Sequence, residues 1–144
     1  MALYGRDGFG EDAFLPASAD GPVPTDRPVL VDKARWLAER DALASRNAPL
    51  GLLLEAGEDL DGIEADIGRF ALIALRVPRY TDGRAYSKAR MLRERFAFAG
   101  ELRAVGDVLH DQIPFMRRCG FDSFEVTHEP TIRALREGRV RGVA

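Results

Sequence analysis

The chain has very little cysteine: Cys119 is the only one in 144 residues. A single cysteine excludes an intrachain disulfide and a four-cysteine iron–sulfur cluster within one chain, and it is typical of a reducing compartment. The sequence also lacks any apolar run near the roughly 20 residues that span a bilayer. Its start has no positively charged leader followed by an apolar segment. We therefore expect a cytoplasmic protein that does not act at a membrane.

An excess of charge of one sign is also absent, since the formal net charge is -2. Wholesale binding to nucleic acid or to an anionic membrane is therefore not expected. The charge is uneven, however, because residues 79–118 contain more arginine and lysine than acidic side chains. This segment can attract a small anion or an acidic partner, or it can simply form solvated helix faces.

Several catalytic motifs are missing. The sequence contains no G-x-G-x-x-G, no G-x-x-x-x-G-K-[ST], no G-x-S-x-G and no H-E-x-x-H. These absences argue against a dinucleotide site, a P-loop, a hydrolase nucleophile elbow and a zincin centre. We predict no metal ligands, and the residues do not identify a cofactor.

What is present, from residue 28 onward, is a regular alternation of short apolar runs with amphipathic runs. The apolar runs predict strands over 29–31, 50–55, 70–77, 101–105 and 122–126. The amphipathic runs predict helices over 32–45, with Trp36 near its edge, over 58–68 and 84–96, then up to residue 118, and over 130–137. We expect residues 28–144 to form a single α/β domain. Residues 1–27 are rich in glycine and proline without a sustained period, which predicts a flexible N-terminal arm.

Repeated βα units imply a mainly parallel sheet of four to five strands, because helix-length crossovers join parallel strands. Two architectures fit this order: an open three-layer sheet and half of a (β/α)₈ barrel. Arg103 and Glu125 lie inside short strands, and charges are placed more easily on the inner side of a barrel-type curve, which slightly favours the half-barrel. A half-barrel leaves exposed edges, so we expect a possible homodimer.

The carboxyl ends of parallel strands share one edge of a sheet, and α/β proteins bind ligands there. The loop after the third strand combines Arg79, Thr81, Gly83 and Arg84 at a helix start. Free backbone N–H groups and two guanidinium groups suit a small oxyanion. The alternative is that Thr81 or Asp82 only caps the helix while Gly83 completes a turn.

Three residues at this predicted edge are candidates for acid–base catalysis: Asp82, Asp107 and His128. Further candidates for ligand binding are Tyr86, Arg103 and Gly106. Each also has a structural interpretation, because an aspartate can cap a helix, a tyrosine ring can pack on the sheet and a glycine can make room for a neighbour.

Four stretches resemble an uncharacterised bacterial family, domain of unknown function 934. They are residues 78–87 (PRYTDGRAYS), 89–93 (ARMLR), 100–109 (GELRAVGDVL) and 117–122 (RRCGFD). Members are commonly labelled probable oxidoreductases involved in sulfite reduction, because their genes adjoin that of the sulfite reductase haemoprotein. Relatives look more uniformly helical around the position of Pro114. Because proline lacks a backbone N–H and clashes with the preceding turn, we expect the helix in this chain either to kink or to begin late, near residue 112.

The resemblance implies a role in assimilatory sulfite reduction. That reaction needs siroheme and an iron–sulfur cluster, and the chain lacks the thiolates for such a cluster. Our leading hypothesis is therefore an accessory protein that binds a sulfur oxyanion or the sulfite reductase. The alternative is a stand-alone oxidoreductase or lyase whose unidentified cofactor enters the edge where the strands end.

Overall fold

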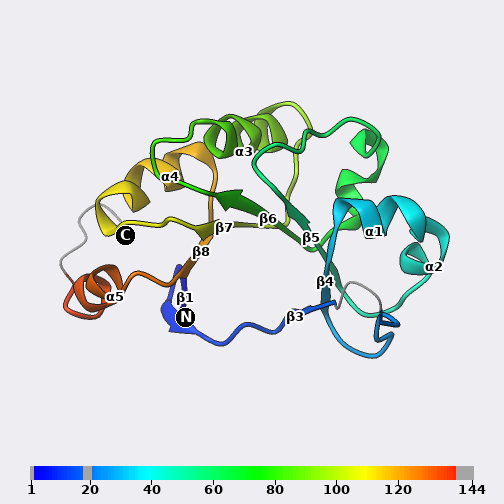
Figure 1. The fold of residues 1–144 in the computed structure, drawn as a ribbon, viewed down its shortest axis with the longest axis horizontal. Coiled ribbons are helices and arrows are strands. Elements are labelled where there is room, and N and C mark those ends of the chain that lie inside the picture. The colour runs from blue at the N-terminus through cyan, green and yellow to red at the C-terminus, as the bar shows by residue number, and fades with distance from the viewer. Residues whose placement is uncertain (1, 18–20, 139–144) are drawn as a thin grey trace.

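In the computed structural model of the chain, residues 2–17 and 21–138 are described, and they form one eight-stranded sheet with helices on its outer side (Figure 1). The strand order is β2-β1-β8-β7-β6-β5-β4-β3. Residue 1 and residues 18–20 of the predicted arm, and residues 139–144 of the predicted domain, lie outside the described residues.

The strands are β1 (Ala2–Gly5), β2 (Gly8–Gly10), β3 (Leu15–Pro16), β4 (Val29–Asp32), β5 (Leu50–Leu54), β6 (Leu72–Val77), β7 (Glu101–Gly106) and β8 (Ser123–Val126). The helices are α1 (Lys33–Ala38), α2 (Arg40–Ala44), α3 (Arg84–Glu94), α4 (Ile113–Cys119) and α5 (Glu129–Arg136). Two short 3₁₀ helices are η1 (Glu64–Arg69) and η2 (His110–Gln112).

The five predicted strands are β4 to β8, and they pair in parallel as the βα order requires. The predicted number of four to five strands is too low, because residues 2–16 add three more. In this segment β1 pairs antiparallel with β8 and with β2, while β3 pairs in parallel with β4. These added strands are only two to four residues long, which is too short for a side-chain period to appear in the sequence.

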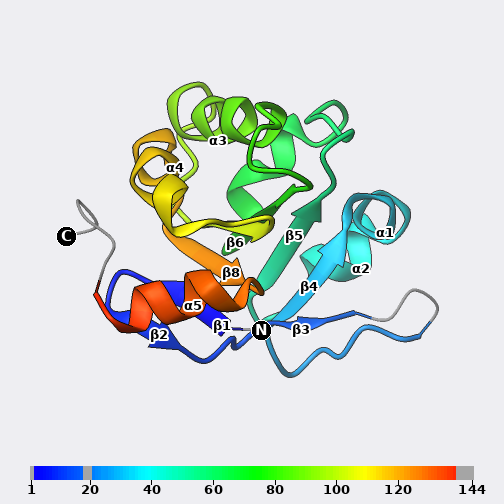
Figure 2. The same ribbon diagram turned by 60° about the vertical axis from the view of Figure 1, so that its left-hand side comes forward.

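The sheet curls into a half-barrel, so the curved alternative describes the fold and the open three-layer sheet does not (Figure 2). Alternate residues of β6 face opposite sides. Ile73, Leu75 and Val77 belong to the core with the buried face of α3. Ala74 and Arg76 therefore face the inner side, where residues 11–14 connect β2 to β3 (Figure 1).

The first predicted helix divides into α1 and α2. Asp32 caps α1, because its Oδ1 accepts a hydrogen bond from the Arg35 N–H at 2.7 Å. Trp36, placed near the helix edge by the sequence pattern, is in fact fully buried. Its indole Nε1 donates to Asp66 Oδ2 at 2.9 Å. This polar partner allows the large ring to sit in the core.

Two other predicted helices differ in the structure: the first is not an α-helix, and the second begins late. The predicted helix over 58–68 is replaced by turns and η1, because Asp59 Oδ1 accepts from the Asp61 N–H at 3.0 Å and Gly62 has a φ of 86°. That local bond offers the backbone an alternative to the helix. Helix α4 begins late, at Ile113, so Pro114 falls in its first turn, where no backbone donor is needed.

Candidate functional site

The parallel register brings the loops after β6, β7 and β8 to one edge of the sheet. Val77 is paired with Gly106, and Gly106 is paired with Val126. A direct bond links two of the loops, because Asp107 Oδ2 accepts a hydrogen bond from the Tyr80 N–H at 2.8 Å. Residues that follow different strands thus become neighbours, as the topology predicted.

A cleft of about 530 Å³ lies at this edge. Its lining residues are Arg76, Val77, Pro78, Val105, Gly106, Asp107, Glu125, Thr127 and His128. It brings together three of the predicted site residues, Gly106, Asp107 and His128, and adds Arg76 and Glu125. Two carboxylates and an imidazole around one cleft can accept and donate protons. Glu125 could have been found from the sequence as a charge on the inner side of a strand.

Several residues of the cleft also have structural roles. His128 precedes α5, and its Nδ1 lies 2.8 Å from the Thr131 Oγ1. Arg76 forms an ion pair with Glu55, with 3.2 Å between Nε and Oε1. Gly106 has a φ of 118°, a conformation that L side chains rarely adopt. The cleft is therefore built on groups that also hold the loops in place.

In the loop after β6, Asp82 serves its own helix. Its Oδ1 accepts from the Arg84 N–H at 3.0 Å, and its carboxylate lies 2.6 Å from Arg84 Nη2. Gly83 has a φ of -73°, so it does not need the positive φ that only glycine adopts readily. Thr81 and Arg79 are exposed. The capping role thus falls to Asp82, with a carboxylate already at the start of α3.

The Arg84 guanidinium and backbone N–H lower the pKa of Asp82 from 3.8 to about 2. A carboxyl group with a depressed pKa in the folded state contributes stability above its unfolded pKa, and that contribution is lost as the pH falls. We expect Asp82→Asn to make the loss of stability between pH 3.8 and about 2 shallower than in the wild type. Urea denaturation midpoints across this pH range measure it. Identical slopes for the two proteins would contradict the assignment.

Of the remaining predicted ligand-binding residues, Tyr86 contacts this loop, whereas Arg103 lies apart from it. The Tyr86 hydroxyl donates to the Tyr80 carbonyl oxygen at 2.7 Å, and its ring packs on Phe115 with centroids 5.3 Å apart. Burial raises the pKa of Tyr86. Arg103 lies on the inner side of the half-barrel, paired with Glu101 and with Asp12 of the N-terminal segment. The structure therefore separates Arg103 from the loop of residues 79–84.

Lys88 is a contributor to this edge that the sequence did not reveal. It is buried, and its ammonium donates to the carbonyl oxygens of Glu55, Ala56 and Glu58 at 3.0, 3.2 and 2.6 Å. Desolvation lowers the pKa of Lys88. All three of its donors are used, so Lys88 fastens the loop after β5 to α3 and does not point at a ligand.

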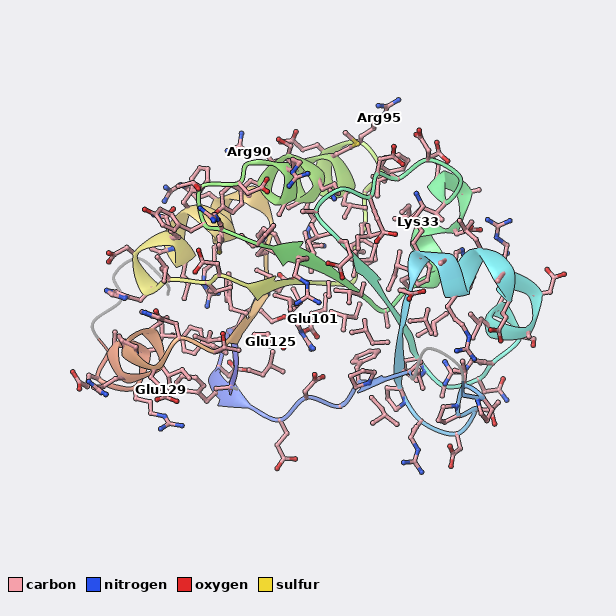
Figure 3. The ribbon with its side chains drawn as sticks, in the orientation of Figure 1. Lys33, Arg90, Arg95, Glu101, Glu125 and Glu129 are labelled. Carbon is pink, nitrogen blue, oxygen red and sulfur yellow. The ribbon has the colours of Figure 1, made fainter. Side chains whose placement is uncertain are left out.

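A second candidate surface, which we call the arginine face, is formed by exposed arginines of α3, of α4 and of the residues on either side of α3, together with Phe115: Arg79, Arg90, Arg95 and Arg118. All four arginines are exposed, and within residues 2–17 and 21–138 none has a carboxylate at ion-pair distance. Arg90 and Arg118 lie over the Phe115 ring at 5.9 and 5.8 Å from its centroid. Arg90 and Arg95 project outward from the molecule (Figure 3).

Neither a metal-binding cluster nor a membrane-spanning helix is present in the part of the chain that the structure describes. Among the described residues, no three His, Cys, Asp or Glu side chains are grouped so that they could hold a metal ion. No helix in the described part of the chain has the length and apolar character needed to cross a membrane.

Comparison with known proteins identifies a family. Residues 51–141 match a family described as a bacterial protein of unknown function, DUF934. No curated protein matches the chain. The matched region begins in β5 and includes the loop after β6, the cleft and the arginine face. The family therefore accounts for well over half of the sequence, and the chain belongs to the DUF934 family.

Proposed function

We propose that this protein is an accessory protein of sulfite reduction that docks on the sulfite reductase through its arginine face. The partner comes from the resemblance to the sulfite-reduction family noted in the sequence. The observation that carries the docking surface is that four exposed arginines have no carboxylate within ion-pair distance among the described residues, and that two of them, Arg90 and Arg118, lie over the Phe115 ring. Arginine and aromatic side chains are enriched at protein interfaces. An acidic surface on the partner would complement them.

The geometry favours docking over the binding of a sulfur oxyanion in the loop of residues 79–84. The Asp82 carboxylate accepts from the backbone at the start of α3 and pairs with Arg84. An incoming oxyanion would have to displace a negative group that is already well bonded there. Arg79, in the same loop, is exposed and has no carboxylate within ion-pair distance among the described residues.

The charge-reversal variant Arg90→Glu/Arg118→Glu tests the docking surface. We expect it to bind the purified sulfite reductase at least about tenfold more weakly than the wild type, mainly through slower association, because like charges then face the acidic partner. The wild-type affinity should also fall with rising salt. Biolayer interferometry with immobilised reductase at several salt concentrations measures both effects.

Two control variants make this test specific. Arg133→Glu changes the charge of an exposed arginine on α5, away from the arginine face, and should leave the affinity nearly unchanged. His128→Gln alters the cleft where the alternative, a stand-alone enzyme, would have its acid–base group. A loss of binding in His128→Gln as large as that in the double reversal would favour the cleft and contradict our proposal.

A further inference from the structure

The inner side of the half-barrel holds a buried arginine that the docking proposal does not use. The side chain of Arg103 is 3% exposed. Its Nη2 lies 2.9 Å from Glu101 Oε2, and its Nε lies 3.4 Å from Ser123 Oγ. The Ser123 hydroxyl also donates to Glu101 at 2.7 Å. Glu101 alone therefore neutralises the charge of Arg103 within the sheet.

A second carboxylate reaches Arg103 from outside the sheet. Asp12 lies in the segment of residues 11–14 that connects β2 to β3, and its Oδ2 is 3.0 Å from Arg103 Nη1. The other oxygen of Asp12 accepts from the Phe14 N–H at 3.0 Å. Figure 3 shows Glu101 and Glu125 on the side of the sheet that this segment crosses. One arginine is thus shared by two carboxylates, one of them brought by a connecting loop.

The connecting segment is held by few contacts. The backbone bonds that join this part of the chain to the neighbouring strand begin at Leu15, whose N–H donates to the Pro28 carbonyl oxygen at 3.0 Å. Before that point, Asp12 supplies an ion pair to Arg103, and the Phe14 ring packs on Gly51, where an added Cβ would lie 3.2 Å from the ring. Residues 11–13 are exposed. Opening this segment breaks the ion pair with Arg103 and removes the Phe14 ring from Gly51.

On the β6 side, the neighbours of Arg103 are apolar. Ala74 is paired with Arg103 across β6 and β7, so the two side chains share the inner side, and Leu72 and Val105 lie on the same side two residues along each strand. All three are nearly fully buried, with exposed fractions of 0 to 6%. Within the chain itself, Asp12 supplies a carboxylate to Arg103, and the Phe14 ring lies at Gly51, the β5 residue that is paired with Leu72.

We propose that Arg103 is the anion-binding group of a site on the inner side of the half-barrel, and that residues 12–14 occupy this site in place of a small monocarboxylate with an apolar body. The ligand's carboxylate takes the place of Asp12 on Arg103, and its apolar part takes the place of the Phe14 ring. This inference does not depend on docking to the reductase. Because Asp12 is tethered, it competes at an effective concentration of about millimolar.

Benzoate is the probe, and calorimetric titration of the full chain is the measurement. The variant Asp12→Asn removes the competing charge but keeps an oxygen that can accept from the Phe14 N–H. We expect it to bind benzoate at least about tenfold more tightly than the wild type. Glu11→Gln, which removes a neighbouring exposed charge that does not touch Arg103, should behave as the wild type. Equal benzoate affinity in Asp12→Asn and Glu11→Gln overturns the proposal.

Two further arms complete the test. Replacing Arg103 by lysine in the Asp12→Asn background should abolish benzoate binding, and sulfite should not replace benzoate; tighter binding of sulfite than of benzoate overturns the monocarboxylate assignment. Hydrogen exchange covers the case in which the lysine variant does not fold. In the wild type, saturating benzoate should speed amide exchange within residues 11–16, because the ligand displaces this segment. Unchanged exchange there means that Asp12 is only a structural ion pair.

Discussion

Replacing Arg93 by methionine should lower the free energy of unfolding by about 3–4 kcal/mol. The Arg93 guanidinium donates to the carbonyl oxygens of Phe98, Gly100 and Gly120 at 2.7, 2.9 and 3.0 Å. It also pairs with Asp122 Oδ2 at 2.5 Å. Methionine keeps much of the apolar stem but leaves these acceptors without the charged donor. Denaturation by urea, monitored by circular dichroism, measures the difference.

The expected effect is large because Arg93 joins segments that are distant in the sequence. It extends from α3 to the loop before β7, to the end of α4 and to the start of β8. Gly120 fits against its stem so closely that an added Cβ would lie 2.6 Å from Arg93 Cγ. The exposed Arg95, two residues along the chain, is the matched control. Arg95→Met should change stability by less than about 0.5 kcal/mol, and equal effects in the two variants would contradict this interpretation.

The substitution Gly106→Ala should destabilise the protein by about 3 kcal/mol or more. Gly106 has a φ of 118°, and a Cβ added there would lie 2.4 Å from the Val77 carbonyl oxygen. That oxygen cannot move away easily, because it accepts from the Asp107 N–H at 2.7 Å. Alanine therefore forces apart the ends of β6 and β7, at the bottom of the cleft. Thermal denaturation followed by circular dichroism measures the decrease in melting temperature of Gly106→Ala relative to the wild type.

Gly57 provides the control for this prediction. It lies in the loop after β5 at the same edge of the sheet, and a Cβ added there meets nothing within 4 Å. Gly57→Ala should leave stability within about 0.5 kcal/mol of the wild type. If Gly106→Ala and Gly57→Ala had the same melting temperature, the close approach of β7 to Val77 would not be a constraint on the fold. Because Gly106 also lines the cleft, loss of function in Gly106→Ala alone would not identify it as a ligand-binding residue.

The sequence was sufficient for much of the fold because the strands from β4 to β8 alternate with helices at intervals that only parallel pairing can accommodate. The helix predicted to end at residue 118 ends at Cys119, where Gly120 follows with a φ of 120°. The prediction of a helix over 58–68 was wrong, because hydrophobic spacing does not reveal that the Asp59 side chain accepts a hydrogen bond from the backbone of its own turn. The strands of residues 2–16 were missed for a related reason: their partners, β8 and β4, come much later in the chain.

For the candidate site, the topology correctly placed Gly106, Asp107 and His128 around one cleft. It did not anticipate the partners of the charged groups. Asp82 binds Arg84 rather than facing Asp107, and Arg103 is covered by Asp12 on the inner side. Whether the predicted residues act on a ligand stays a prediction, but their contacts explain why these residue types occur at these positions.

The sequence by itself determined the order of strands and helices, the parallel core and the edge at which the loops meet, because these depend on the local spacing of apolar side chains and on the turns between them. Only the tertiary structure decided that the sheet curls, that the N-terminal strands extend it, and that Arg103 is buried beneath Asp12. The physical reason is that an ion pair or a strand pairing between distant segments depends on which groups folding brings together, and no local pattern records that choice.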